Sequence, residues 1–173
     1  KGDIQKAISI LKEAIRNIPN EEKFHYYLAT LYDKDGKSDD AIKEFEEVIK
    51  INPDSADALN YIAYSYAEKN IKLDYAFELA KKATGIESDN PAYIDTLAWI
   101  YYKKNMKNEA LSEIKKAIEL LKDIKDAVIY EHFGEITLGL NMIKETENAW
   151  QESLKINPNN QNLKVKLEKL AKE

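Results

Sequence analysis

The chain has 173 residues, 44% of them hydrophobic and 33% charged, so it is long enough and apolar enough to fold around a sizeable core. Its 26 basic and 31 acidic residues give a net charge of −5, and we expect no nucleic-acid partner because phosphate backbones require a concentrated positive field. The chain has no cysteine, which excludes a disulfide framework, a zinc cluster and a thiol nucleophile.

Composition and an internal repeat both indicate helices. Glycine (5 residues) and proline (4 residues) are scarce, which is typical of helical proteins. Two columns of residues recur with a period of about 34 residues, the second column four positions behind the first. The first column is Ala7, Ala41, Ala76 and Ala110, and the second is Leu11, Phe45, Ala80, Ile114 and Trp150. A fixed period of about 20 to 50 residues predicts stacked supersecondary units.

The predicted elements are, in chain order, one helix, four helix pairs and a last helix, about ten helices in all. They divide into the second helix of a truncated repeat (1–21), four repeats (22–55, 56–90, 91–126 and 127–159) and a capping helix (160–173). Two repeats run long, by one residue near 71–74 and by two residues near 121–126. We therefore expect a single array over residues 1–173.

The repeat of residues 22–55 illustrates how each helix pair is predicted. Apolar and small residues spaced by three and four positions share one face of a helix. They are Leu28, Ala29 and Tyr32 in the first helix and Ala41, Phe45 and Val48 in the second. Gly36 accommodates the end of the first helix, and Pro53 ends the second. Each repeat is therefore predicted to be an antiparallel helical hairpin.

The last helix has the pattern of a cap. Leu163, Leu167 and Leu170 share one side of it, and the other side is mostly charged. Stacked repeats leave an apolar face at each end, which a terminal helix with a polar outer face covers. Residues 160–173 are therefore predicted to close the array.

The repeats share residue types at fixed positions. These residues are Leu28, Ala29, Tyr32, Gly36, Ala41, Phe45, Val48 and Pro53 in one repeat, and Leu59, Ile62, Ala63, Tyr66, Asn70, Ala76 and Ala83 in the next. This pattern resembles that of the tetratricopeptide repeat family, and the resemblance covers nearly the whole chain. It implies an all-α fold, a right-handed α-solenoid built from antiparallel helix hairpins.

Small and aromatic residues have separate expected roles in this architecture. The small residues Ala29, Ala63, Ala98 and Gly134 lie where each first helix meets its partner. A larger side chain there would overpack a dense interface, at a cost of about 1–3 kcal/mol. The aromatic residues Tyr32, Tyr66 and Tyr101 are expected to fill the space between hairpins.

The resemblance implies a concave groove lined by first helices, in which a peptide or helix of another protein is held. The candidate groove residues are Tyr26, Thr30, Asn60, Tyr64, Asp95, Trp99, Tyr102 and Glu131. The aromatic members are placed where the core does not require them, and exposed aromatic side chains often anchor interfaces. The alternative is that they pack sideways against neighbouring first helices.

The groove is expected to be acidic. Asp57, Asp95, Glu131 and Glu135 would repel an acidic tail and favour a basic or apolar ligand. One subclass of the family grips a terminal carboxylate with Lys, Arg and Asn side chains. At those positions this chain has Tyr26, Thr30, Tyr61, Ala92 and Thr96, so the carboxylate clamp is not expected.

Enzymatic activity is not expected. The two histidines, His25 and His132, lie in different repeats, and neither has the spacing of a metal site or of a nucleophile motif. There is no glycine-rich phosphate loop. We therefore predict no catalytic residue, no metal ligand and no cofactor, and we interpret the many Glu and Lys residues as solvated helix faces.

Two functions remain open on the sequence. The first is a non-enzymatic interaction module or scaffold that binds a partner protein or peptide. The second is a structural scaffold that assembles with copies of itself in a bacterial complex, through the unpaired face of residues 3–17 or through the divergent repeat of 127–159. No segment is apolar over the roughly 18 residues that span a bilayer, so no membrane span is expected.

Several runs, including DALNYIAYSYAEKN and NPAYIDTLAWIYYKKNMKNEA, also resemble the repeat arrays of bacterial envelope lipoproteins. Some of those arrays tether proteases or cell-wall enzymes to the membrane, which would imply a periplasmic adaptor. The compartment stays open between the bacterial cytoplasm and the periplasm. Because Lys1 falls within a repeat, we expect the sequence to be an excerpt with any targeting segment upstream.

Overall fold

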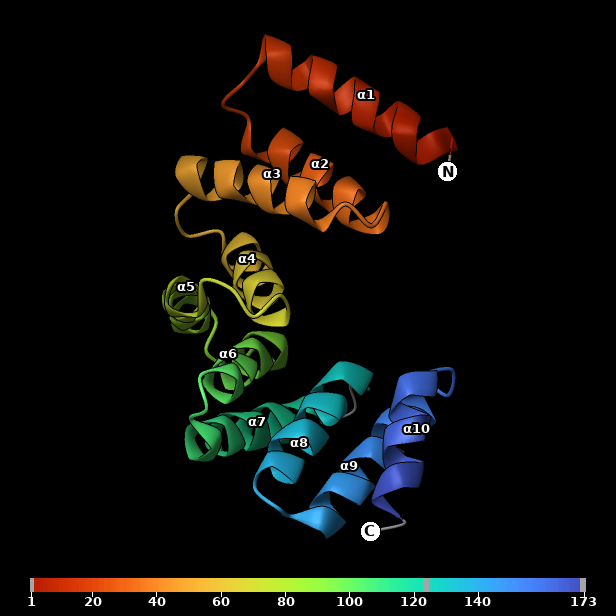
Figure 1. Cartoon of the computed structure of the whole chain (residues 1–173). Coiled ribbons are helices and arrows are strands. Elements are labelled where there is room, and N and C mark those ends of the chain that lie inside the picture. The colour runs from red at the N-terminus through yellow and green to blue at the C-terminus, as the bar shows by residue number, and fades with distance from the viewer. Residues whose placement is uncertain (1, 123–124, 172–173) are drawn as a thin grey trace. The chain divides into compact units, whose positions relative to one another are not determined.

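The computed structural model describes residues 2–122 and 125–171, and every helix or strand assigned in those residues is an α-helix (Figure 1). The ten helices of this part of the chain are α1 (Gly2–Asn17), α2 (Glu22–Lys34), α3 (Ser38–Ile51), α4 (Ala56–Glu68), α5 (Leu73–Ile86), α6 (Pro91–Lys103), α7 (Lys107–Leu121), α8 (Ala127–Gly139), α9 (Ile143–Ile156) and α10 (Gln161–Leu170). The prediction of an all-α fold with about ten helices is confirmed.

One backbone motif forms the turn inside each helix pair. The residues in the left-handed region at these turns are Gly36 (φ 75°), Asn70 (φ 53°), Asn105 (φ 62°) and Asn141 (φ 61°). The next N–H donates to a carbonyl five residues earlier, as Lys37 does to Tyr32 at 2.8 Å, which is the Schellman arrangement. Glycine adopts this conformation because it has no Cβ, and asparagine tolerates it better than most side chains.

The added lengths of two repeats fall near other left-handed residues. Lys72 (φ 49°) lies in the stretch of 71–74, where the sequence indicates one extra residue before α5. Lys122 (φ 47°) follows α7, and the two further residues expected near 121–126 partly coincide with 123–124, which lie outside the described residues.

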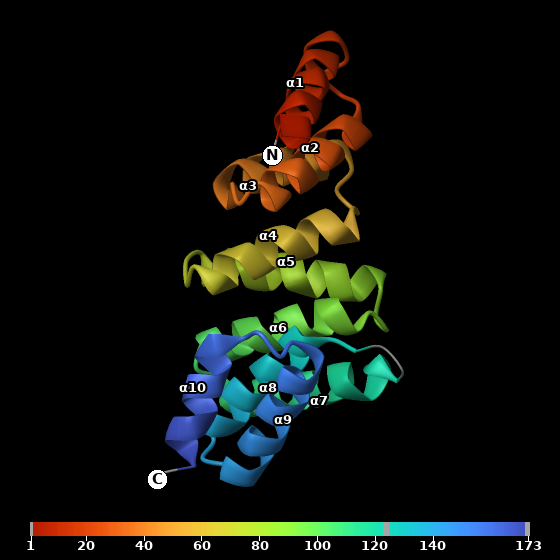
Figure 2. The same ribbon diagram turned by 90° about the vertical axis from the view of Figure 1, so that its right-hand side faces the viewer.

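The helices divide into two compact units, one containing α1–α5 and the other α6–α10. Within the first unit, each helix packs against the next along the chain. The same is true in the second unit, where α6 also contacts α8. Figure 2 shows the paired helices of each hairpin lying side by side.

The first unit has a core in which α1 packs against the hairpin of α2 and α3. Ile8 of α1 joins Leu28, Tyr32 and Ala41 in a buried cluster. The small residue Ala29 is fully buried, as expected where two helix backbones approach closely. Helix α1 therefore covers one face of the following hairpin.

The second unit has one core between α6, α7 and α8 and another beneath the last helix. The first core contains Ala98, Ala110 and Ile114, all fully buried. In the second core, Leu163 of α10 packs against Trp150 of α9, so α10 covers the apolar face of the preceding hairpin.

Candidate partner-binding site

The first unit contains a cavity of about 270 Å³, which we call the α2–α4 cavity. It is lined by Tyr26, Thr30, Asp33, Phe45, Asp57, Asn60, Tyr61 and Tyr64. All of these except Phe45 of α3 belong to the first helices α2 and α4. Within each of these helices the lining residues are spaced mostly by three or four positions, so they share one helix face. Four residues of the predicted groove lie here together, namely Tyr26, Thr30, Asn60 and Tyr64.

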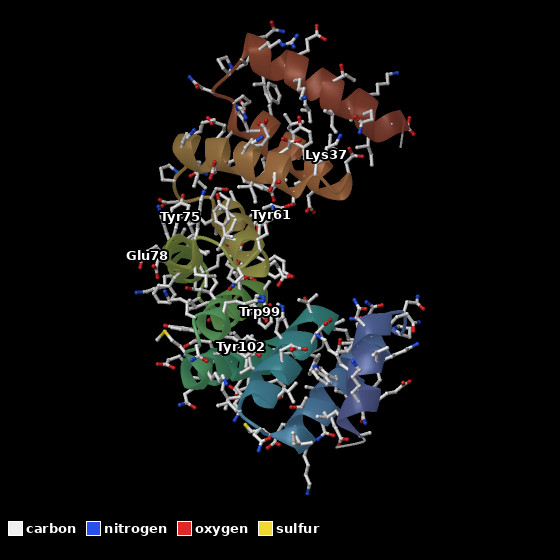
Figure 3. The ribbon with its side chains drawn as sticks, in the orientation of Figure 1. Lys37, Tyr61, Tyr75, Glu78, Trp99 and Tyr102 are labelled. Atoms are coloured by element: carbon white, nitrogen blue, oxygen red, sulfur yellow. The ribbon has the colours of Figure 1, made fainter. Side chains whose placement is uncertain are left out.

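Two hydrogen bonds join α2 and α4 reciprocally across this cavity. The Tyr26 hydroxyl of α2 donates to Asp57 Oδ2 of α4 at 3.1 Å. The Tyr61 hydroxyl of α4, labelled in Figure 3, donates to Asp33 Oδ1 of α2 at 2.6 Å. Each helix therefore presents one phenol and one carboxylate, and each phenol helps to fix the carboxylate of the other helix.

The two phenols remain neutral donors. Burial, followed by the charge of Asp57, raises the pKa of Tyr26. Burial and then the hydrogen bond to Asp33 raise the pKa of Tyr61. A phenol that holds its proton donates a hydrogen bond without neutralising the carboxylate, so the cavity keeps the negative charge of both aspartates.

The wall of the cavity is aromatic. The buried ring of Phe45 makes an edge contact with Tyr26, with centroids 5.6 Å apart, and a tilted contact with Tyr61 at 4.5 Å. These contacts hold the rings of both helices against α3. The tyrosines are themselves only partly buried, so ring surface remains open to a ligand.

One polar atom of the cavity lacks a hydrogen bond. The side-chain oxygen Oδ1 of Asn60 is buried and has no donor among the described residues. A buried acceptor without a donor is unfavourable by about 1–3 kcal/mol, so this oxygen carries an unmet hydrogen-bonding demand.

In the second unit, Asp95, Trp99 and Tyr102 of α6 belong to an internal network. Both carboxylate oxygens of Asp95 lie 2.9 Å from His132 Nδ1 of α8, and both side chains are buried. The Trp99 ring stacks on His132 with centroids 4.1 Å apart and on Tyr102 at 5.1 Å. Figure 3 places Trp99 and Tyr102 on α6.

Burial bears on the groove role predicted for Asp95 and Trp99, which stays a prediction. Trp99 is 7% exposed and Asp95 only 4%, so neither side chain projects into an open groove in this structure. For Trp99 the structure has the sideways packing that was the alternative. The physical reason is the imidazole of His132, which supplies both a flat face for the indole and a nitrogen for the carboxylate.

The remaining predicted groove residue, Glu131 of α8, is hydrogen-bonded to Asn160, the residue that caps the start of α10. Its Oε2 accepts a hydrogen bond from Asn160 Nδ2 at 2.9 Å.

The other histidine, His25, is also buried, with Nδ1 2.7 Å from Glu44 Oε2 and Nε2 3.0 Å from the carbonyl oxygen of Pro19. Both histidines therefore join elements of the fold.

Sequence reasoning missed the pairing of His132 with Asp95 and that of Tyr61 with Asp33. The available signal was their separation, 37 residues for the first pair and 28 for the second, because about one repeat length brings two residues onto adjacent first helices.

Within residues 2–122 and 125–171, no three His, Asp or Glu side chains gather as metal ligands do. The same residues contain no helix whose length and apolar character would let it cross a membrane.

Two models of the tetratricopeptide repeat match the sequence, one over residues 1–70 and the other over residues 93–123. Together they cover more than half of the chain. The search of curated proteins gives no match.

Solved structures of tetratricopeptide repeat proteins are similar to this chain. TTC0263, a thermophilic protein of Thermus thermophilus, is 16% identical, with a TM-score of 0.74 over 99% of this chain and 92% of its own. MamA from Desulfovibrio magneticus RS-1 is also 16% identical, with a TM-score of 0.74 over 92% of this chain and 89% of its own. The first repeat domain of Spaghetti (RPAP3), bound to the HSP90 peptide SRMEEVD, is 21% identical, with a TM-score of 0.60 over 68% of this chain and 90% of its own.

At these identities the solved structures show a shared fold. The solenoid of helix hairpins and the two sequence matches are the features by which the family is recognised. Proteins of this kind generally serve as non-enzymatic interaction scaffolds. The chain belongs to the tetratricopeptide repeat family.

Proposed function

We propose that this chain is a non-enzymatic scaffold that holds a peptide or helix of a partner protein against the first helices of its first unit. The α2–α4 cavity is the observation that carries this proposal. It combines partly exposed aromatic rings with fixed polar groups, and such surfaces are enriched at the centres of protein interfaces. The predicted groove residues Tyr26, Thr30, Asn60 and Tyr64 are the proposed contacts.

The second unit contributes less to the proposed binding surface. Asp95 and Trp99 are occupied by their contacts with His132, so a partner would reach them only by displacing packed groups. Tyr102 is half-buried and Glu131 already accepts a hydrogen bond from Asn160. The binding roles predicted for these four residues stay predictions.

Selection of peptides tests the proposal. A displayed library of random twelve-residue peptides is selected against the chain, and the affinities of the enriched peptides are measured for wild type and Tyr64→Ala. We expect Tyr64→Ala to bind these peptides about tenfold more weakly or worse, because truncating a central aromatic contact costs at least about 1.4 kcal/mol of binding free energy. The matched control is Tyr75→Ala, whose side chain is 43% exposed on α5 and does not line the cavity. Failure to enrich any peptide, or equal binding by Tyr64→Ala, would contradict the proposal.

A self-assembling scaffold is the second candidate. Ile10 of α1 is 58% exposed and Ile18, just after α1, is 54% exposed, and apolar side chains of this size favour association when they cluster. Sedimentation of the chain against an Ile10→Lys variant separates the two candidates. A dimer that this substitution abolishes would favour self-assembly, whereas a monomer at every concentration would remove it. Service in a bacterial complex stays a prediction.

A further inference from the structure

We propose that the α2–α4 cavity is a recognition site for a single arginine side chain of the partner peptide. This inference rests on the proposed function and names the residue type that the cavity selects. The site is made by groups of three kinds, namely the two aspartates, the aromatic rings around Phe45 and the amide side chain of Asn60.

Charge is the first reason for a cationic occupant. Asp33 and Asp57 contribute two negative charges from opposite helices, and none of the lining residues, all within the described residues, is basic. Their phenol partners, Tyr61 and Tyr26, donate hydrogen bonds without adding positive charge. A carboxylate has about four lone-pair sites, so the hydrogen bond from Tyr61 does not saturate Asp33.

The aromatic wall is the second reason. Cations bind over the faces of tyrosine and phenylalanine rings through the ring quadrupole, and a planar guanidinium also stacks on them. The rings of Tyr26, Phe45 and Tyr61 are held in contact with one another, so this wall is formed before a ligand arrives. A preformed surface reduces the entropy lost on binding.

The number of acceptors favours arginine over lysine. Asp33 on α2 and Asp57 on α4 present acceptors from two helices, and the lining residue Asn60 has a buried Oδ1 without a donor among the described residues. Arginine carries five N–H donors in a planar fork that can reach several acceptors at once, whereas lysine carries three donors on one compact group.

Size is consistent with one side chain. The cavity of about 270 Å³ is smaller than the roughly 300–1,000 Å³ of pockets that hold drug-sized ligands. A single long side chain that enters from a peptide lying across α2 and α4 suits this volume. The rest of the peptide would contact Thr30 and Tyr64 at the edge.

The experiment uses the peptides enriched from the random library. We expect them to share an arginine at one position, and we expect replacement of that arginine by citrulline, a neutral residue of nearly the same shape, to weaken binding about ten- to hundredfold. Replacement of the same arginine by lysine should weaken binding less than replacement by citrulline, because lysine keeps the positive charge. Enriched peptides with no shared arginine would overturn this inference and leave the proposed function standing, whereas enrichment of no peptide would overturn both.

A double variant, Asp33→Asn with Asp57→Asn, tests the origin of the preference. It keeps the acceptors for Tyr26 and Tyr61 and removes the charge, so the citrulline and arginine peptides should bind it within about threefold of each other. The matched control, Glu47→Gln with Glu78→Gln, removes two charges from α3 and α5 at residues that do not line the cavity, Glu78 being labelled in Figure 3. The inference would be overturned if the Asp variant kept the full preference of the wild type for the arginine peptide over the citrulline peptide. It would also be overturned if the wild type bound the lysine and arginine peptides equally. The citrulline comparison on wild type decides the question even if the Asp variant does not fold.

Discussion

Gly134 and Gly85 have opposite surroundings. A Cβ atom built on Gly134 of α8 would lie 2.2 Å from both Cδ1 and Nε1 of the Trp150 indole, whereas a Cβ on Gly85 of α5 would meet nothing within 4 Å. Real Cβ atoms do not approach a rigid ring so closely. At Gly134 the absent side chain therefore lets α8 approach α9, and at Gly85 it does not serve packing.

Alanine substitution at the two glycines should therefore have opposite effects. We expect Gly134→Ala to lower the free energy of unfolding by about 1–3 kcal/mol through overpacking. We expect Gly85→Ala to raise it by about 0.5–1 kcal/mol, because alanine loses less backbone entropy in a helix. Urea denaturation followed by circular dichroism measures both values. Similar losses in both variants would contradict the packing argument.

The residue with left-handed backbone in each hairpin turn also contributes to the stability of the fold. Asn105 (φ 62°) ends α6, and the following N–H of Met106 donates to the Tyr101 carbonyl at 2.9 Å. We expect Asn105→Ala to lower the free energy of unfolding by about 1 kcal/mol and Asn105→Gly to leave it unchanged or higher, because only alanine introduces a strained Cβ without a local polar group. Thermal unfolding of the pair measures the difference, and equal melting temperatures would show that the turn is not strained.

Between elements, Ala98 limits the approach of α6 to its partner helix α7. Ala98, Ala110 and Ile114 are all fully buried in one cluster. We expect Ala98→Leu to lower the melting temperature, since additional methyl groups in a dense interface cost about 1–3 kcal/mol. Ala92→Leu, at an exposed position in the first turn of α6, is the matched control. An unchanged melt for Ala98→Leu would mean that the repeat register is misplaced.

The contact between α6 and α8 depends on Trp99. We expect Trp99→Ala to lower the free energy of unfolding by about 3–5 kcal/mol, because the indole is buried against His132 and Tyr102 and its loss also exposes the Asp95–His132 pair. Denaturant unfolding measures the loss, with the exposed Tyr27→Ala as control. A melt that barely changes, together with lost partner binding, would instead make Trp99 an interface anchor.

Elements could be predicted from the sequence more fully than the site. The recurrence of Ala41, Ala76 and Ala110 reports helix packing directly, because only small residues permit close backbone approach. The exposure of Trp99 could not be predicted, because it depends on which side chain the next first helix presents, and there His132 covers the ring. At the repeat position equivalent to His132, the first unit has Tyr61, which instead hydrogen-bonds to Asp33 beside the α2–α4 cavity.

At the scale of the whole molecule, the contacts of each helix are mostly with its neighbours along the chain. The stability of such arrays is approximately a sum of repeat and nearest-neighbour contributions. We therefore expect Gly134→Ala to increase amide hydrogen exchange in α8, α9 and α10 more than in α2, α3 and α4. Uniform acceleration over the described helices would show that the chain unfolds as one cooperative block.

The position of the two tryptophans has a further use. The chain has only two, and both Trp99 and Trp150 belong to the second unit, where each is almost completely buried. Intrinsic indole fluorescence is therefore a selective optical reporter of that unit, whereas far-ultraviolet dichroism averages over every helix. Coincidence of the two denaturation curves would indicate a single transition, and separated midpoints would resolve an intermediate in which one half of the molecule has melted before the other.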